Sequence, residues 1–283
     1  MSTLQELVKP VIPPALWNFA RSSWYGIYRA SLWPAATFHP WRRKSLQHLD
    51  KYRDIHAGER CFIIGNGPSL KDTDLSLLRN EYTFGMNRIY LMFPELGFST
   101  SYYLSINSLV IDQCAEDILA LQTPRFLSWR SREYIKDALN KNSELPSEPP
   151  LSFLHTTYTG RKFAHDAGER LWEGATVTYV AMQLAYHMGF KQVILIGVDH
   201  SFSTKGKPNT TVVSGGDDPD HFDSNYFGKG FRWQLPDLDT SEIAYHKAKE
   251  NYTAADREIL DATVGGKLTV FPKVEYQSLF NHQ

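Results

Sequence analysis

The sequence predicts an α/β fold built on a doubly wound, mostly parallel sheet, and two segments carry this prediction. In the first, the apolar and β-branched run 61–64 leads into the loop 65–70, Gly-Asn-Gly-Pro-Ser-Leu, which is typical of a strand that ends in a tight turn before a helix. In the second, apolar residues recur at helical spacing over 177–188 and stop at Gly189, and the apolar strand 192–197 follows. A helix followed by a buried strand is the repeating unit of a doubly wound sheet.

The remaining elements follow from the same periodicities. Strands are predicted at 82–86, 101–106 and 125–128, helices at 111–121, 241–252 and 254–263, and a turn with a strand at 265–271. The proline-containing segment 140–150 is predicted to be a loop, and the Gly, Pro, Asp and Asn content of 203–240 indicates a long active-site loop. The chain is therefore divided into an N-terminal helical arm, 1–55, and a Rossmann-like domain, 56–283.

The N-terminal arm differs from the rest of the chain in composition. Its aromatic residues are Trp17, Phe19, Trp24, Tyr25, Tyr28, Trp33, Phe38 and Trp41, and the basic residues among them are Arg21, Arg29, Arg42, Arg43 and Lys44. Over residues 1–49 six Lys and Arg stand against one acidic residue, Glu6, a local surplus of +5. Aromatic rings beside cations suit a membrane interface with anionic lipid. They equally suit a helical arm packed on the main domain or on a partner, and the sequence leaves both open.

The overall composition excludes several classes of function. A formal net charge of -1 over 283 residues gives no general attraction to nucleic acid, so no nucleic-acid partner is expected. Two cysteines, Cys61 and Cys114, are too few for a disulfide scaffold. Lys9 and nearby prolines interrupt any signal-peptide core, and no apolar run reaches the roughly 20 residues of a membrane span. We expect a cytoplasmic protein, held peripherally at the inner membrane if the arm binds lipid.

Polar residues stand where the predicted parallel strands end, which is where open α/β sheets bind ligands. In the loop 65–70, the glycines and Ser69 with outward-facing amides favour a phosphate, and a plain strand-to-helix turn is the alternative. The loop is not a Walker motif, and Leu70 occupies the third glycine position of the dinucleotide fingerprint. The residues at the other strand ends are Asn87, Asn107, Asp199 and His200.

These motifs, in this order, resemble a known family. The loop 65–70, Met86-Asn87-Arg88, the helix 176–190 and Ile196-Gly197-Val198-Asp199 together resemble the 6-hydroxymethylpterin diphosphokinase-like (MptE-like) family. The same order is similar to bacterial sialyltransferases that use CMP-activated sugars and to motility-accessory flagellin glycosyltransferases. The resemblance covers roughly residues 58–275 and leaves the N-terminal arm outside.

The resemblance implies a nucleotide site. In the sialyltransferases the glycine loop lines the CMP-sugar site, an asparagine after the second strand contacts the nucleotide, and a Thr-Ser-Gly segment opens the helix at the donor site. The matching residues here are Gly65, Asn66, Gly67, Pro68, Ser69, Asn87, Asn107, Thr176, Val177 and Thr178. The Gly-Ile-Asp run of that family matches Gly197, Val198 and Asp199.

The sequence departs from the sialyltransferase pattern at two functional positions. Those enzymes have a tyrosine that steadies the leaving phosphate, whereas His200 and Ser201 follow the aspartate here, and Lys229 stands where they have the general-base histidine. A transferase still needs a base for the acceptor hydroxyl and cations for the departing phosphate. The catalytic candidates are His221, His200, Lys229 and Asp199, with Lys205, Lys207 and Arg232 as further cations.

Three functional hypotheses remain open. The first is a glycosyltransferase of bacterial surface glycan synthesis, with a CMP- or other nucleotide-activated sugar donor, a glycan or lipid-linked acceptor, and no required cofactor. The second is a pterin diphosphokinase that uses ATP, with Mg²⁺ held at the acidic cluster 217–223. The third is a nucleotide-binding scaffold without catalysis. The arm favours the first, because lipid-linked acceptors lie at the inner membrane, and the oligomeric state is left open.

Overall fold

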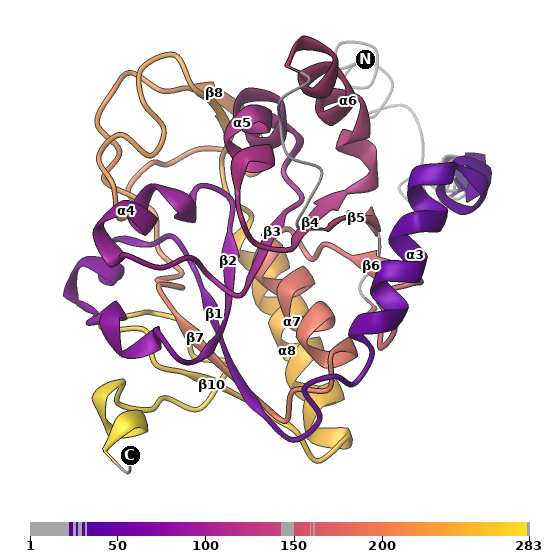
Figure 1. Cartoon of the computed structure of the whole chain (residues 1–283). Helices are drawn as coiled ribbons and strands as arrows, with labels where there is room; N and C mark the ends of the chain where they lie inside the picture. The colour runs from indigo at the N-terminus through magenta and orange to yellow at the C-terminus, as the bar shows by residue number, and fades with distance from the viewer. Residues whose placement is uncertain are drawn as a thin grey trace, which may run out of the picture.

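The centre of the molecule is an eight-stranded sheet in the order β10-β7-β1-β2-β3-β4-β5-β6, with every neighbouring pair parallel (Figure 1). The computed structural model describes residues 23–24, 27, 30–31, 33–142, 150–158, 160 and 162–281. The strands are β1 (Arg60–Ile64), β2 (Tyr82–Met86), β3 (Tyr102–Ser105), β4 (Arg125–Ser128), β5 (Leu151–Thr157), β6 (Arg170–Trp172), β7 (Gln192–Ile196) and β10 (Glu258–Asp261). The chain runs outward from β1 to β6 and returns to place β7 on the other side of β1, so the strand order reverses at that pair. The doubly wound, Rossmann-like fold is confirmed.

Helices cover both faces of the sheet, which is why its central strands read as continuous apolar runs. One apolar core joins the sheet to α3 (Pro40–Tyr52), α7 (Val177–His187) and α8 (Leu238–Ala254), and the other joins it to α5 (Ser108–Ala120) and α6 (Arg132–Lys141). Within β1, Phe62 and Ile63 alternate between these two cores, and both are fully buried. Shorter helices are α4 (Phe93–Leu96), η1 (Pro68–Asp72), η2 (Leu75–Leu78), η3 (Ile89–Met92), η4 (Trp129–Ser131) and η5 (Gln277–Phe280).

Most of the predicted elements are present, and four predictions were wrong in part. The turn after β1 leads into the short 3-10 helix η1 rather than an α-helix. The predicted helix 254–263 is instead the strand β10, because α8 ends at Ala254 and the following four-residue run pairs with β7. The tail 265–271 forms no strand ladder, although Leu268 and Phe271 are buried in the core. The loop 203–240 contains a small antiparallel pair, β8 (Thr211–Val213) and β9 (Arg232–Gln234).

Several elements were not predicted, among them β5, β6 and α6. The predicted loop 140–150 begins inside the last turn of α6, and residues 143–149 lie outside the described part of the chain. Both cysteines are buried and free, as expected for a chain without a disulfide scaffold.

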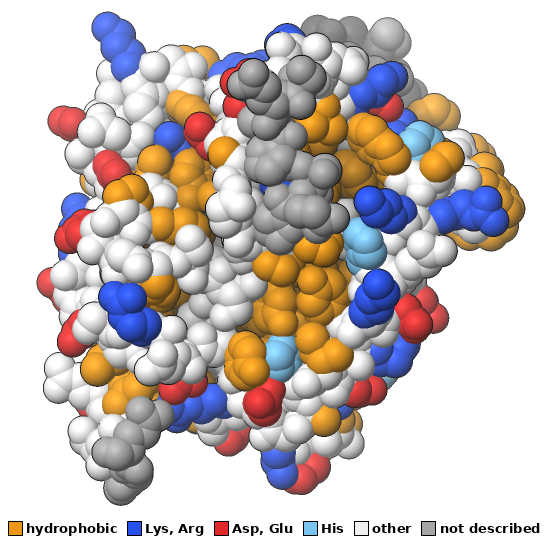
Figure 2. Space-filling view, viewed as in Figure 1, with side chains coloured by type: hydrophobic (Ala, Val, Ile, Leu, Met, Phe, Trp, Pro, Cys, Tyr) orange, Lys and Arg blue, Asp and Glu red, His pale blue; other side chains and the backbone are white. Residues whose placement is uncertain are grey.

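In the part of the N-terminal arm that the structure describes, most residues before α3 are exposed, whereas α3 packs on the main domain. Four large apolar side chains before α3 are exposed: Trp24 by 59%, Ile27 by 66%, Trp33 by 53% and Phe38 by 63%. Figure 2 shows apolar side chains gathered at the edge of the molecule where α3 lies, on the right of the view. In α3, by contrast, Trp41 stacks on Phe153 of β5, so this helix packs on the main domain. Six of the aromatic and basic residues named for the arm lie outside the described residues: Trp17, Phe19, Arg21, Tyr25, Tyr28 and Arg29. The boundary between the arm and the Rossmann-like domain at residue 55 stays a prediction.

In the described residues, no helix combines the length and the apolar character that crossing a bilayer would demand.

Candidate active site

A cleft of about 940 Å³ opens at the carboxyl ends of the central strands, beside the β1–β7 pair where the strand order reverses. This is the place and the size expected of a small-ligand site in an open α/β sheet. The cleft brings together most of the sequence-predicted site residues, namely Gly65, Asn66, Gly67, Asn87, Asn107, Thr176, Val177, Thr178, Asp199, His200 and His221. Pro68, Ser69 and Lys229 are not among its lining residues.

The loop after β1 is tied to the loop after β7 by its backbone. The amide of Gly65 donates to Ile196 O at 2.8 Å and that of Gly67 to Gly197 O at 2.9 Å. The amide of Ser69 donates to Asp199 Oδ1 at 3.2 Å. These three amides are therefore not free to hold a phosphate, and the expectation that they point outward was wrong for each of them.

The two glycines of this loop are required by close packing rather than by a special backbone angle. A Cβ atom on Gly65 would lie 2.1 Å from Gly197 O, and one on Gly67 would lie 1.7 Å from Asp199 Oδ2. Neither glycine has a positive φ. Their absent side chains let the loops after β1 and β7 come together and form the floor of the cleft.

Asp199 holds the two loops together from the β7 side. Its Oδ2 accepts the Ser69 hydroxyl at 2.8 Å while Oδ1 accepts the Ser69 amide. Burial raises the pKa of Asp199 above its ordinary value, and the hydrogen bonds from Ser69 offset only part of that rise. These contacts give the Asp199 carboxylate a positioning role, because they hold the loop after β1 against the loop after β7. Its partner Ser69 is buried and does not line the cleft.

His221 lines the cleft, and two contacts fix the orientation of its ring. Its Nδ1 lies 2.8 Å from Asp218 Oδ2, and its ring stacks on Tyr226 at a centroid distance of 4.0 Å. Asp218 is in turn held by the amides of Asp220 and Phe227, which donate to its carboxylate. Because the carboxylate engages Nδ1, the proton belongs on that nitrogen and Nε2 is left as a base. A histidine held in this way by a carboxylate has the arrangement of a general base.

The second histidine candidate is placed differently. His200 lines the cleft at a positive φ of 53°, and its Nε2 lies 3.6 Å from Glu242 Oε2. An acidic neighbour on Nε2 occupies the nitrogen that would otherwise face a substrate, so the geometry favours His221 as the base.

The predicted cations lie away from the cleft wall. Lys205, Lys207 and Lys229 are exposed, and Arg232 pairs with Asp112 at 2.7 Å. None of these four lines the cleft. The expectation that they stabilise a departing phosphate is not supported by their positions, because a cation must reach the ligand to do so.

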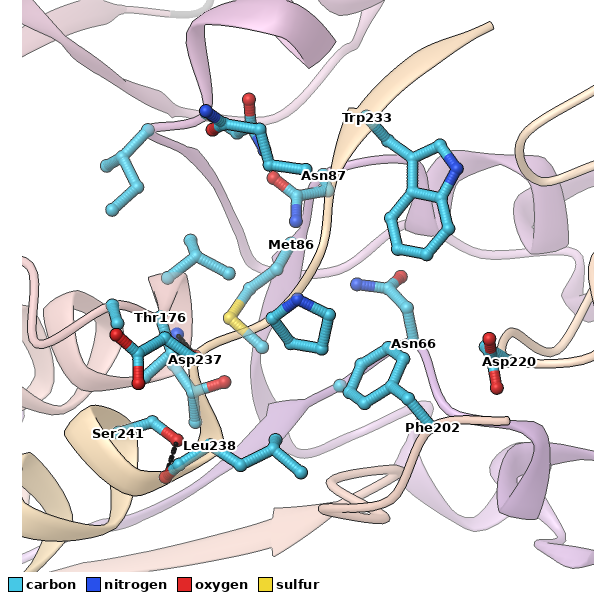
Figure 3. A pocket seen from close by; sticks show the side chains of 18 of the residues that line it. Asn66, Met86, Asn87, Thr176, Phe202, Asp220, Trp233, Asp237, Leu238 and Ser241 are labelled. Carbon is cyan, nitrogen blue, oxygen red and sulfur yellow. Dashed lines mark hydrogen bonds between the residues drawn. The ribbon is translucent and has the colours of Figure 1, made fainter. Parts of the chain in front are cut away.

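Amide side chains and helix starts make up the polar wall of the cleft. Asn66 Oδ1 is buried without a hydrogen-bond partner, and Asn87 has a positive φ of 52° and accepts the Ser105 hydroxyl at 3.0 Å through Oδ1. Figure 3 shows both amides, with the rings of Phe202 and Trp233, among the side chains that line the cleft. The side chains that cap the starts of α5 and α7 are Asn107 and Thr176.

A family model described as 6-hydroxymethylpterin diphosphokinase MptE-like matches residues 38–205, which is more than half of the chain. The chain belongs to this family. The membership predicted from the four motifs is confirmed, with one correction: the match begins inside the arm, before α3, and ends at residue 205 rather than near 275.

Two solved structures resemble the chain at low sequence identity. One is the MAf glycosyltransferase from Magnetospirillum magneticum AMB-1, with 12% identity and a TM-score of 0.47 over 84% of this chain. This chain spans only 39% of the length of that protein. The other is the sialyltransferase CstII from Campylobacter jejuni in complex with CMP-3FNeuAc, with 16% identity and a TM-score of 0.41 over 76% of this chain and 86% of that one. No curated protein matches the chain.

The cleft of this family member also contains residues that sequence reasoning missed. Arg130 stands just past β4, and Glu173 follows β6; both line the cleft and pair at 2.6 Å. Arg130 is the one Lys or Arg among the described lining residues. The sequence contains a signal for Arg130, because β4 has its predicted bounds and Arg130 is a charged residue two positions past the end of that strand.

The carboxylates of the acidic segment 217–223 accept hydrogen bonds from other groups of the protein, among them Ser203, Thr204 and the Phe227 amide. Burial raises the pKa of Asp220, but hydrogen bonds from Ser203 and Thr204 lower it by more, so its pKa is below the ordinary value. Among the residues described, no three His, Cys, Asp or Glu side chains are grouped so as to hold a metal. The Mg²⁺ requirement of diphosphokinase chemistry stays a prediction.

Proposed function

We propose that this protein is a nucleotide-dependent transferase, and that it transfers a sugar from a CMP- or other nucleotide-activated donor to a glycan or lipid-linked acceptor in bacterial surface glycan synthesis. The observation that carries the proposal is that His221, held by Asp218, lines a cleft that asparagine amides also line at the strand switch point. A fixed imidazole base beside a nucleotide-sized cleft is what activation of an acceptor hydroxyl requires.

The reaction we propose is a direct displacement at the anomeric carbon of the donor sugar. His221 Nε2 takes the proton of the acceptor hydroxyl, whose oxygen forms the new glycosidic bond. The bond from the sugar to the phosphate breaks, and the nucleotide leaves with the electron pair. Asp218, at 2.8 Å from Nδ1, stabilises the imidazolium that results. No metal is required for this sequence of steps.

The nucleotide half of the proposal predicts binding that depends on two amides. We expect calorimetric titration with CMP, CDP, UDP, GDP and ATP to give metal-independent binding of a cytidine or other pyrimidine nucleotide. Asn66→Ala and Asn87→Gly should each weaken it about tenfold, because each removes hydrogen bonds inside the cleft. Glycine is chosen at 87 because it tolerates the positive φ of 52°. Asn225→Ala, an exposed asparagine that does not line the cleft, is the matched control.

The family description favours a second candidate, 6-hydroxymethylpterin diphosphokinase activity. That reaction moves diphosphate from ATP and depends on Mg²⁺. ATP binding that appears only with Mg²⁺ in the same titrations would replace the glycosyltransferase proposal with this one. Nucleotide binding without any turnover would favour a nucleotide-binding scaffold, and no nucleotide binding would contradict all three.

We further propose that the arm places the protein at the inner face of the membrane, where a lipid-linked acceptor lies. The support is the exposure of Trp33 and Phe38, which are followed in the sequence by the exposed cations Arg43 and Lys44. Arg42, just before these two cations, is buried and donates to Gly168 O, so it is not part of this surface. The protein should sediment with vesicles that contain anionic lipid and not with neutral ones. Replacing Trp33 and Phe38 together by Ala should abolish this, and Val213→Ala, an equally exposed apolar site at 66% on β8, should not. Equal sedimentation of the two variants would contradict membrane docking through the arm.

A further inference from the structure

Arg130, the one Lys or Arg among the described residues that line the cleft, has no role in the proposed reaction. Its Nη2 donates to Glu173 Oε1 at 2.6 Å, and its guanidinium lies over the ring of Tyr158 at 5.6 Å. Its Nε is buried and has no hydrogen-bond partner. A buried donor without a partner costs free energy and leaves the guanidinium charge incompletely compensated. The side chain as a whole is 23% exposed and lines the cleft, so a ligand can contact the guanidinium there. Guanidinium groups hold oxyanions particularly well, because several donors lie in one plane.

The backbone around Arg130 adds positive potential at the same end of the cleft. The helices α5 and α7 both begin there, and their first residues, Ser108 and Val177, line the cleft. Hydrogen bonds connect the Arg130–Glu173 pair to the starts of both helices. The hydroxyl of Ser131, next to Arg130, donates to Ser108 Oγ of α5 at 3.2 Å. The amide of Thr176, which caps α7, donates to Glu173 O at 2.9 Å. Each helix start carries a partial positive charge of about half an elementary charge.

The environment beneath Arg130 is positive as well. His155, on β5, is buried, and its pKa is lowered to about 4. Burial is the larger cause, and the charges of Arg170, Arg42 and Arg130 lower the pKa further. Besides Arg130, which pairs with Glu173, two further cations, Arg42 and Arg170, therefore act on His155 behind this end of the cleft.

The opposite end of the cleft is unsuited to an anion. The amides of Gly65, Gly67 and Ser69 already donate within the protein, and the carboxylate of Asp199 lies against that loop. Asp220 adds a second carboxylate on the same side as His221. An anionic group is consequently favoured beside Arg130 and disfavoured beside the loop 65–69.

We propose that Arg130 is the specificity-determining residue for an oxyanion of the ligand, which it binds in competition with Glu173. The oxyanion is either the phosphate of the donor nucleotide or the carboxylate of an acidic sugar. This inference rests on the proposed function, since it describes one subsite of the same cleft. When the cleft is empty, Glu173 neutralises Arg130. When the ligand binds, its anionic group pairs with Arg130 either alongside Glu173 or in place of it.

The test uses two small anions that contain no nucleotide base. Dissociation constants are measured on the full chain by phosphorus NMR for pyrophosphate and by proton NMR for N-acetylneuraminate. Arg130→Gln should weaken at least one of the two by about tenfold or more, because a charge-assisted hydrogen bond is lost. Loss of pyrophosphate binding assigns the subsite to phosphate, and loss of N-acetylneuraminate binding assigns it to a carboxylate. Because neither probe is a nucleotide, failure of the nucleotide titrations does not decide the outcome.

Two further variants separate anion binding from a structural role. Glu173→Gln should tighten binding of the same anion severalfold, since it removes the competing carboxylate, and a merely structural pair would not give this gain. Arg232→Gln removes the same charge from an exposed residue that does not line the cleft, and should leave both constants within about twofold. If Arg130→Gln fails to fold, Arg130→Lys is measured in its place together with Glu173→Gln. Glu173→Gln must then still bind the anion more tightly than the wild type does. Failure of the wild type to bind either anion, equal losses in Arg130→Gln and Arg232→Gln, or no gain in Glu173→Gln would overturn the inference.

Discussion

Replacing His221 by Gln should lower kcat for sugar transfer by about 10²- to 10⁴-fold, which is the contribution a positioned general base makes. Gln keeps a polar side chain of similar length but cannot accept the proton of the acceptor hydroxyl at neutral pH. The KM for the donor should change little, because the base acts on the acceptor. The measurement is the initial rate of nucleotide release from whichever donor the calorimetric titrations identify, with and without acceptor.

Three comparison variants make this result specific. His246→Gln changes an exposed histidine on α8 that does not line the cleft, and its rate should equal that of the wild type. Asp218→Asn should give a smaller loss than His221→Gln, since it removes only the carboxylate that orients Nδ1. His200→Gln should retain most of the activity, because Glu242 already occupies its Nε2 side. A His221→Gln protein that keeps its activity within about threefold would exclude His221 as the base.

Gly65→Ala should destabilise the protein by about 3 kcal/mol or more, the upper range for inserting a methyl group into packed structure. The added Cβ would lie 2.1 Å from Gly197 O and 2.6 Å from the Gly197 carbonyl carbon. Both are backbone atoms held in place at the end of β7, so no side-chain rotation relieves the contact. The loops after β1 and β7 must separate, which strains the hydrogen bond from the Gly65 amide to Ile196 O. The free energy of unfolding, measured by urea titration, gives the size of the effect.

Gly215→Ala is the matched control for this prediction. A Cβ at Gly215 would have no atom within 4 Å, and its φ is not in the left-handed range. The same substitution should therefore change the free energy of unfolding by less than about 0.5 kcal/mol. Equal urea midpoints for the two variants would show that the loops after β1 and β7 are not packed as described.

The sequence predicted well those features that depend on neighbouring residues. Strand β1 carries an apolar run and helix α7 carries apolar residues at helical spacing, and the structure has both within a residue or two of the predicted bounds. Strand β4, with only Phe126 and Leu127 as apolar residues, also has its predicted bounds. Polar residues after the strands, such as Asn87 and Asp199, could be assigned to one edge because parallel strands end on the same side of a sheet. The motif order also identified the family.

Elements whose local pattern was short or ambiguous were decided by tertiary contacts. The run Glu258–Asp261 has only four residues, and it is a strand because β7 offers a free edge beside it. Leu268 and Phe271 look like strand residues, yet they are buried as packing groups without a ladder partner. The local periodicity of a sequence shows which side chains are apolar, but it does not show which strand or helix they will pack against.

By itself, then, the sequence determined the sheet, the family and the edge at which a ligand would bind. Only the tertiary structure decided the chemistry at that edge. His221 is brought to the cleft because the Phe222 amide donates to Asn66 O at 3.0 Å and the Arg88 amide to the Tyr226 hydroxyl at 3.2 Å. Contacts of this kind join residues 130 or more positions apart, as the bonds from Ser69 to Asp199 also do. Such pairings have no periodicity in the chain, because they depend on how separately formed strands and loops pack against one another.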